Sequence, residues 1–479
     1  MATIEADPKA RGFVKLWIGT MLILFVVLIL LGVTMRLGQA SILGLDPGLF
    51  YAMMTMHGLG MAGVLYSAGF AGLWLLISGT TKLHLGVFKV AFVLIVLGAV
   101  GLVVATLIGR FGPGWYVLYP LPFVNPAWPS WATGTAIISL MLLGVGWLIS
   151  QLDMLRGLAA RYGLRRMFGW HWFSGDEGED VPIVVLIATV VALAGALATI
   201  CGAAMLMMYL LQWFNPALKF DPLLMKNMVF MFGHTIVNIA MYCGVAFVYA
   251  FLPSFTGRPW KGNKVVAISW NATLLIVLFA YFHHLYMDFN QPSWVQHLGQ
   301  IASYSSAIPA TAITGLGVIG QLWRADTKWS MVPIALVAGI VGWIVGGFAA
   351  VVDATIAFNT MLHNTLWVPG HFHTYFLVGF VVLLIAFVEI LHEREGEPGA
   401  LGAVATMLLG GYGFVMAFYL GGVNSVPRRF ATYDNLTFSS LADTGRSLAG
   451  FGAVFATVFL SGLLAYLALT WSKRRSAVA

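Results

Sequence analysis

Residues Gly370 to Leu391 read GHFHTYFLVGFVVLLIAFVEIL, two histidines followed by an apolar stretch that is long enough to cross a lipid bilayer. An imidazole at membrane depth is costly unless it is hydrogen-bonded or bound to a metal ion. Residues two apart on a helix point about 200° apart, so His371 and His373 face opposite sides of one helix. The stretch therefore predicts a membrane-spanning helix that offers ligands to two different metal groups.

The composition of the whole chain agrees with a membrane protein. Of its 479 residues, 60% are hydrophobic and 9% are charged, and the mean hydropathy is +0.89. So little polar surface cannot cover a water-soluble globule. Apolar segments of about 20 residues predict an all-α polytopic membrane protein, a single domain over residues 1–479 with twelve spans, roughly at 14–35, 52–78, 87–109, 133–155, 183–212, 226–253, 265–286, 297–323, 331–350, 371–392, 401–421 and 448–471.

An even number of spans puts both termini on one side of the membrane, and the basic residues indicate which side. All but seven of the 25 Lys and Arg residues fall at the termini or in the connections on their side. Because basic loops stay in the cytoplasm, we expect cytoplasmic termini in the inner membrane of a bacterial or archaeal cell. The net charge of +7 reflects this topology and gives no reason to expect nucleic acid as a partner. The N-terminus predicts no removable signal peptide.

Three further histidines predict a metal site in the outward halves of the sixth and seventh spans. They are His234 in FGHTIVN and the pair His283 and His284 in YFHHLY. Three neutral imidazoles suit copper or zinc better than magnesium or calcium. Copper is the more sensible metal beside a heme, because the site must pass electrons.

The second span carries one more histidine, His57 in MHGLGM, in its outward part. Glycines at 58 and 60 remove side-chain bulk beside it, as a flat macrocycle packed against a helix requires. Paired with a second histidine at the same depth, His57 predicts a bis-histidine, low-spin heme suited to electron transfer.

This arrangement resembles the catalytic subunit I of the heme-copper oxidase superfamily over nearly the whole chain. That family has twelve spans, with a heme ligand in the second, copper ligands in the sixth and seventh, and paired heme ligands in the tenth. The sequence HNTLWVPGHFH, residues 363–373, looks most like the B-type branch. The sequence PRRF, residues 427–430, resembles the arginine pair that binds heme propionates before the last span.

The resemblance implies two hemes and one copper ion; the heme type, b, a or o, stays open. Six histidines would bind metal: His57 and His373 the low-spin heme, His371 the high-spin heme, and His234, His283 and His284 the copper. Three residues would contact heme propionates: Arg428 and Arg429, through guanidinium chemistry, and His363, near the high-spin heme.

One position departs from the dioxygen-reducing members that this chain resembles. Most of them have a tyrosine one helical turn after the first copper ligand; it is bonded covalently to a copper histidine and supplies an electron and a proton. Here the position is Asn238, whose amide has no accessible redox chemistry and no proton to release near neutral pH. Residues 277–279, where another branch has its tyrosine, read VLF, and neither Tyr281 nor Tyr242 is a convincing substitute.

The amide at Asn238 favours a reaction that needs no protein radical. Reducing two nitric oxide molecules to nitrous oxide and water consumes two electrons and two protons, which heme iron and copper can supply between them. The site therefore resembles the unorthodox copper-containing nitric oxide reductases that branch from B-type oxidases. We expect a nitric oxide reductase. The alternatives are a terminal oxidase of the cytochrome c or quinol type, which reduces dioxygen with its tyrosine moved or missing, and a heme sensor without turnover.

Protons and electrons must both reach this site. Hydroxyls of the sixth and eighth spans could form a proton route: Tyr242, Tyr249, Ser303, Ser305, Ser306, Thr311 and Thr314. Electrons must come from outside the chain, which has no CxxCH heme motif and no bis-cysteine copper motif. We expect a second subunit with a copper or cytochrome domain, fed by cytochrome c or a similar donor. Two segments are the expected docking surfaces. One is the outward cap, the segment 110–132 around Trp115 and Trp128, and the other is the loop from Asp288 to His297.

Overall fold

Three Asp-Pro pairs begin long helices. Asp7, Asp46 and Asp221 each accept a hydrogen bond from a backbone N–H two or three residues later, at 2.6, 2.9 and 2.7 Å. An aspartate in this position satisfies a donor that the helix leaves unpaired, and the proline that follows loses no hydrogen bond in the first turn. The helices that begin in this way are α1 (Pro8–Gln39), α2 (Pro47–Ser78) and α7 (Pro222–Thr256).

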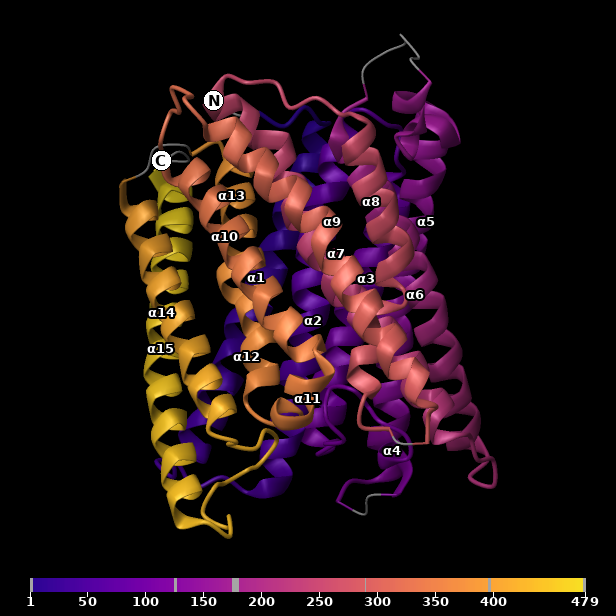
Figure 1. Cartoon of the computed structure of the whole chain (residues 1–479), viewed down its shortest axis with the longest axis vertical. Helices are drawn as coiled ribbons and strands as arrows, with labels where there is room; N and C mark the ends of the chain where they lie inside the picture. The colour runs from indigo at the N-terminus through magenta and orange to yellow at the C-terminus, as the bar shows by residue number, and fades with distance from the viewer. Residues whose placement is uncertain (1–2, 125–126, 175–180, 289, 395–397, 477–479) are drawn as a thin grey trace.

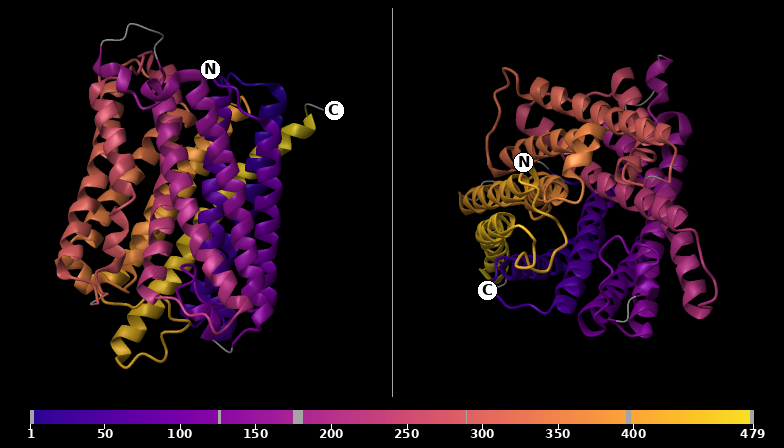
Figure 2. Two further views of the ribbon diagram at one scale, coloured as in Figure 1. Left: turned by 90° about the vertical axis from the view of Figure 1, so that its right-hand side faces the viewer. Right: turned by 60° about the horizontal axis from the view of Figure 1, so that its bottom comes forward.

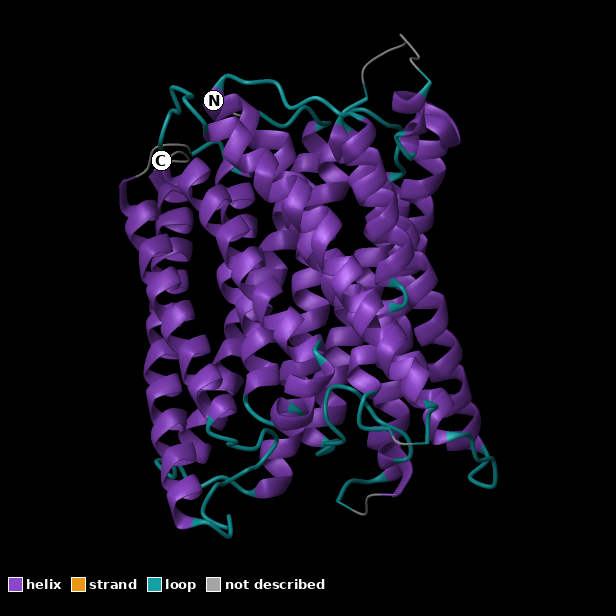
Figure 3. Ribbon diagram, viewed as in Figure 1, coloured by secondary structure: helices purple, strands orange, loops and turns teal. Residues whose placement is uncertain are grey.

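The computed structural model describes residues 3–124, 127–174, 181–288, 290–394 and 398–476. Within these ranges the regular structure is helical, as Figures 1 and 3 show, apart from one antiparallel bridge between Thr365 and Pro427. The other helices are α3 (Leu85–Val103), η1 (Val104–Ile108), α4 (Leu121–Val124), α5 (Ser130–Met167), η2 (Trp170–Phe173), α6 (Ile183–Phe214), α8 (Lys264–Val277), η3 (Ala280–Leu285), α9 (Ser293–Leu322), α10 (Met331–Ala354), α11 (Ile356–Leu362), α12 (Trp367–His373), η4 (Thr374–Phe380), α13 (Val381–Leu391), α14 (Pro398–Val423) and α15 (Ser439–Ser476).

Eleven helices of the described chain are long and apolar enough to cross a membrane. The expected span at 297–323 falls on α9, which packs against α8 and α10 but is not among the eleven. Its sequence carries Ser, Thr and Gln residues and an internal Pro309, which lower its hydropathy. The expected number of twelve spans is therefore not confirmed. α1 begins and α15 ends at the same end of the bundle (Figure 1); which side of the membrane this is stays a prediction.

The centre of the bundle is formed by α2, α7 and the continuous stretch Trp367–Leu391, which are among its most buried parts. α1 and α3 lie further out and expose large apolar side chains such as Ile23, Val93 and Leu97. Outward-facing apolar side chains on a membrane protein are matched by lipid. Four of the predicted ligands, His57, His234, His371 and His373, therefore sit on the inner helices. His283 and His284 sit on η3, at the end of a less buried span. Figure 2 shows the bundle from two further sides.

The helix that carries His371 and His373 changes its winding directly after them. α12 ends at His373, η4 is a π-helix over Thr374–Phe380, and α13 continues the same span. A π-helical turn inserts an extra residue into the helix and occurs frequently at functional sites. Here it sets the angular position of both histidines relative to the buried end of the span.

Candidate metal centre

All ten residues that the sequence singles out line one internal cavity of about 720 Å³. They come from α2, α7, η3, α12 and the loops before α12 and before α15, so segments from His57 to Arg429 converge on it. The set consists of His57, His234, Asn238, His283, His284, His363, His371, His373, Arg428 and Arg429. A mostly apolar space of this size, with a few convergent histidines and arginines, is suited to large cofactors with polar edges.

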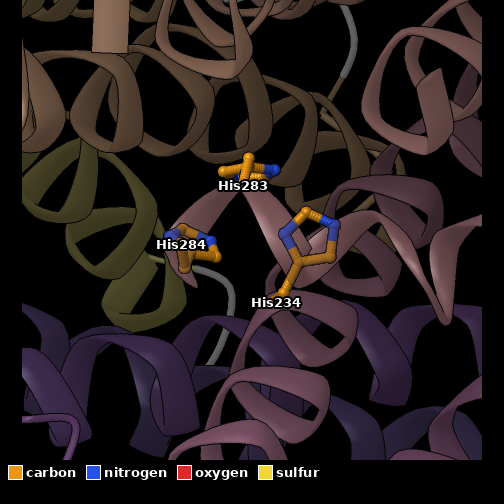
Figure 4. A group of neighbouring side chains, drawn as sticks. All are labelled: His234, His283 and His284. Carbon is orange, nitrogen blue, oxygen red and sulfur yellow. The ribbon is translucent and has the colours of Figure 1, made fainter. Parts of the chain in front are cut away.

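Three of these histidines form a compact group (Figure 4). His234 comes from α7, and His283 and His284 come from the 3-10 segment η3. One ring nitrogen of each lies within 4.8 Å of the others. This is slightly wider than the roughly 3.5 Å between nitrogens that bind one ion with bonds of about 2 Å, so small ring rotations would complete a three-histidine site.

Different neighbours orient the three rings. Nδ1 of His283 lies 2.9 Å from Oγ of Ser303. That hydroxyl has the carbonyl oxygens of Gly299 and Ala280 at 2.7 and 3.0 Å as acceptors, so its oxygen accepts from the histidine and leaves Nε2 for a metal ion. Nδ2 of Asn238 donates to the backbone carbonyl oxygen of His234 at 2.8 Å. It also lies 3.3 Å from Nε2 of the imidazole ring of His234.

His284 is oriented by aromatic packing. Phe230 stacks on its ring with centroids 4.9 Å apart and planes 15° apart. Trp115, from the outward cap, meets Phe230 edge to face at 6.4 Å. A Cβ at Gly58 would lie 2.4 Å from Cβ of Trp115, and a Cβ at Gly233 would lie 3.4 Å from its indole. Trp115 is thus packed between Gly58 of α2 and Gly233 of α7.

His57 and His373 face each other across the cavity. Their ring centroids are 6.2 Å apart and their planes differ by 22°. Two imidazoles on opposite sides of one metal ion, each with a bond of about 2 Å, have centroids roughly 6 Å apart. Nδ1 of His57 donates to the carbonyl oxygen of Leu28 at 2.8 Å, and Nδ1 of His373 donates to that of Pro369 at 2.7 Å. Both Nε2 atoms therefore remain as ligands.

The space beside His57 comes from a glycine on another helix. A Cβ at Gly32 of α1 would lie 2.9 Å from Cε1 of His57. The expectation that Gly58 and Gly60 make room for a macrocycle needs correction, because their nearest neighbours are Trp115 and Leu28. These two glycines permit close packing of protein, whereas Gly32 admits the imidazole ring.

His371 turns away from His373, as the helical spacing predicts. Its Nδ1 donates to the carbonyl oxygen of Gly346 on α10 at 3.1 Å, whereas His373 packs against Phe414 and Phe418 of α14. The Nε2 of His371 is left as a ligand in the same cavity as the three-histidine group. One helix therefore presents one imidazole on each of two sides, as the predicted ligands of two different groups require.

Arg428 and Arg429, from the loop between α14 and α15, supply positive charge at one end of the cavity. Arg428 donates to Oδ1 of Asn364 at 3.1 Å, and its buried Nε has no hydrogen-bond partner among the described residues. Arg429 lies over the ring of Tyr116, 4.1 Å from its centroid. Burial, and then the charge of Arg429, lower the pKa of Arg428 to about 9, so it stays charged at neutral pH. Two guanidinium groups with an unused donor fit the carboxylates of heme propionates.

His363 lies beside these arginines. Burial and then the cations Arg428, Lys226 and Arg429 lower the pKa of His363 to about 4. It is therefore neutral at physiological pH. A neutral imidazole can donate one hydrogen bond to an acidic group without adding a further charge.

Sequence reasoning missed Arg36 and Asp353, two charged residues that line the cavity; Lys226 of α7 is a third. Arg36 of α1 lies over the ring of Phe418, 4.7 Å from its centroid, and donates to Oε1 of Gln39 at 2.7 Å. Asp353, three residues beyond the predicted end of the ninth span, is the one carboxylate among the cavity-lining residues of the described chain. Both stand near the end of a span, where a charge is ordinary and gives no sequence signal.

Some of the hydroxyls that were expected to carry protons lie close to one another or to the cavity. The hydroxyls of Tyr249 and Thr314 lie 3.0 Å apart, and Ser306 and Thr311 line the cavity above them. Ser303 instead donates to backbone carbonyls and supports His283.

One of the expected docking surfaces needs correction. Trp128 is buried and donates to Thr133, and Trp115 is packed into the bundle, so neither indole is available to a partner. Trp294, which the sequence places in the loop from Asp288 to His297 and the structure places in the first turn of α9, is exposed.

Comparisons with known proteins identify relatives of this chain. The family model for "Cytochrome C and Quinol oxidase polypeptide I" matches residues 12–457. A cytochrome c oxidase subunit 1 from Thermus thermophilus is 27% identical over 286 residues, which cover 54% of this chain and half of that relative's length. A cytochrome c oxidase polypeptide 1 from Halobacterium salinarum is 24% identical over 436 residues, covering 85% of this chain and 69% of the relative. A solved heme-copper terminal oxidase dimer superposes with a TM-score of 0.75 at 18% identity, covering 97% of this chain and 84% of that one.

Proposed function

Because the chain belongs to the cytochrome c and quinol oxidase polypeptide I family, the catalytic subunits of heme-copper oxidases, we propose that it is a membrane oxidoreductase that reduces nitric oxide to nitrous oxide. Subunit I of this family binds two hemes and a copper ion. The three-histidine group, the facing pair and His371 fit these cofactors in number and chemistry. Three statements go beyond family membership and are proposals: that nitric oxide is the substrate, that the chain belongs to the B-type branch, and that each residue has the role given below.

Asn238 is the observation that carries the proposal. Its amide nitrogen lies 3.3 Å from Nε2 of His234, one turn along α7. An amide in contact with a copper ligand can orient it but supplies neither an electron nor a proton. No hydrogen bond of the described residues joins a tyrosine hydroxyl to His234, His283 or His284: Tyr281, for instance, donates to Asn227. Nitric oxide reduction needs only two electrons and two protons, so this site is sufficient for it.

The named relatives favour a second candidate. Those quoted above are called cytochrome c oxidases, and that name fits a terminal oxidase that reduces dioxygen to water. Such an oxidase would need a phenol from elsewhere. Tyr242, one turn beyond Asn238, lines the cavity and is the residue that this candidate would recruit.

Anaerobic turnover with nitric oxide, compared with dioxygen consumption at matched reductant, separates the two candidates. We expect purified protein to convert two nitric oxide molecules to one nitrous oxide at least about tenfold faster than it consumes dioxygen, a difference of roughly 1.4 kcal/mol in activation free energy. Fast dioxygen consumption with slow nitric oxide turnover would assign the chain to the terminal oxidases. Binding of either gas without turnover would indicate a sensor.

The residues that line the cavity would have three roles: to hold the two hemes, to hold the copper ion, and to neutralise the heme propionates. His57 and His373 would hold the low-spin heme, which accepts electrons, and His371 would hold the high-spin heme that faces His234, His283 and His284. When bound, the high-spin heme iron and copper supply the two electrons that the reaction consumes. Ser303 and Phe230 orient the rings of His283 and His284, and the amide of Asn238 contacts Nε2 of His234. Arg428 and Arg429 would neutralise propionates, with His363 as a neutral donor beside them.

Protons would reach the site along hydroxyls of α7 and α9. Replacing Tyr249 by phenylalanine removes one hydroxyl of the pair with Thr314 and should slow multi-turnover gas reduction at least about tenfold, because proton delivery becomes limiting. Rebinding of photolysed carbon monoxide should not change. The matched control is Tyr209→Phe, which does not line the cavity and whose buried hydroxyl donates to the carbonyl oxygen of Val117. A wild-type turnover rate in Tyr249→Phe would exclude this route.

The chain would work in the inner membrane of a bacterium or archaeon, and relatives come from both. We infer a second subunit with a copper or cytochrome domain, and cytochrome c or a similar protein as electron donor. Cys201 and Cys243 are separate and half-buried or buried, so they provide no copper-cysteine centre. Electrons therefore enter from another polypeptide.

A further inference from the structure

One face of α7 carries a row of residues that contact η3 and the turn after it. The row ends with His234, a proposed copper ligand, and with Phe230, which stacks on His284. It begins about two helical turns earlier with Lys226 and Asn227. Residues spaced three or four apart share one face of a helix. The helix that supplies one copper ligand therefore also contacts the segment that supplies the other two.

The first two residues of the row bind on either side of the histidine pair. Before the pair, the hydroxyl of Tyr281 donates to Oδ1 of Asn227 at 3.1 Å, and Tyr281 is only 9% exposed. Nδ2 of Asn227 donates to a backbone carbonyl oxygen of the preceding turn at 2.9 Å, which turns Oδ1 toward the phenol. After the pair, Nζ of Lys226 lies 2.5 Å from Oδ2 of Asp288.

The segment between these two contacts is weakly held by its own backbone. α8 ends at Val277, and η3 is a short 3-10 helix, whose hydrogen bonds have poorer geometry than those of an α-helix. His283 has the hydroxyl of Ser303 as a partner. The ring of His284 takes part in no hydrogen bond among the described residues and is held by stacking. Its position therefore depends on how the backbone on either side is fixed.

We propose that the hydrogen bond Tyr281–Asn227 and the ion pair Lys226–Asp288 form a two-point clamp that positions His284 for the copper ion. The four side chains are positioning residues, because they act through the backbone of η3. Figure 4 shows that His234 and the histidine pair come from different segments, and the clamp anchors the second segment on the helix of the first. The clamp rests on the proposed function only in that the three-histidine group holds copper, whichever gas is reduced.

Replacing Tyr281 by phenylalanine keeps the buried ring and removes only the hydroxyl. The variant should bind copper about tenfold more weakly, the lower end of the roughly 10–100-fold loss for outer partners of metal ligands, because the clamp acts through the backbone. Titration of the reduced protein with a copper(I) chelator measures this affinity. The infrared C–O band of carbon monoxide bound to the cuprous ion should broaden, because His284 samples more positions.

The matched control is Tyr119→Phe. It removes the hydroxyl of a tyrosine that is 7% exposed and accepts a hydrogen bond from the backbone N–H of Phe220. Copper affinity and the C–O band should stay at their wild-type values in this control. Asn227→Leu should behave like Tyr281→Phe although it leaves the phenol in place, which separates positioning from any redox role of Tyr281.

The ion pair is tested by exchanging its charges. Asp288→Lys places two ammonium groups side by side and should weaken copper binding about threefold, a modest effect because the side chains of the pair are 22% and 23% exposed. Adding Lys226→Asp restores opposite charges in reverse order and should return the affinity to within about twofold of the wild type. Both hemes should be retained in every variant.

Three outcomes would count against the clamp. Wild-type copper affinity in both Tyr281→Phe and Asn227→Leu would overturn it, and so would equal losses of heme and copper, which would show that these contacts support the whole bundle. A wild-type protein without copper would overturn the assignment of the three-histidine group together with the clamp. Because no turnover is measured, these results do not depend on whether nitric oxide or dioxygen is the substrate.

Discussion

Replacing His284 by alanine should remove the copper ion and lower gas turnover by more than about 100-fold, because losing even an outer partner of a metal ligand costs roughly 10–100-fold. The ring of His284 contributes one of only three nitrogens to the group with His234 and His283. Two imidazoles from different helices cannot hold copper with comparable affinity. Metal analysis should show one copper per wild-type chain and less than about a tenth of that in the variant, with two hemes in both.

His297 provides the matched control for this experiment. It is an exposed histidine at the start of α9, and its Nδ1 lies 3.1 Å from the carbonyl oxygen of Ser293. The variant His297→Ala should keep its copper and its turnover. Full copper occupancy and turnover in His284→Ala would contradict the assignment of the three-histidine group.

Replacing His57 by leucine should remove the low-spin heme and slow electron entry by more than about 100-fold. His57 and His373 face each other with centroids 6.2 Å apart, and Gly32 leaves the space for the first ring. The reduced-minus-oxidised spectrum should lose its low-spin bands, and heme analysis should fall from two hemes per chain to one. Carbon monoxide should still bind, because His371 and the copper ligands are untouched. Retention of both hemes with unchanged low-spin bands would show that another residue is the ligand.

Much of the site could be predicted from sequence because the ligands are histidines in apolar segments, where an imidazole has few other reasons to occur. The pair His371 and His373 illustrates this. A spacing of two residues determines that the rings diverge, and they contact α10 and α14 respectively. Membership of the heme-copper oxidase family is likewise confirmed, whereas the B-type branch, the nitric oxide specificity and the residue roles stay proposals.

The contacts between distant segments could not be predicted in this way. Gly32 matters because α1 brings it against His57, 25 residues later in the chain, and one glycine among 54 carries no mark of that. Ser303 was expected to relay protons, yet it supports His283 through a hydrogen bond that depends on how α9 packs against η3. The number of spans is not confirmed for a related reason, because α9 carries hydroxyl and amide side chains that lower its hydropathy.

The shared cavity of about 720 Å³ also bears on how the protein is made. α2, α7 and the stretch Trp367–Leu391 surround it, and without cofactors their inner faces would meet across empty space, which costs stability in proportion to its volume. Heme delivery must therefore precede the final closure of the bundle during biogenesis. A cell starved of heme should accumulate chains that quality-control proteases recognise and degrade, rather than a stable apoprotein awaiting its cofactors.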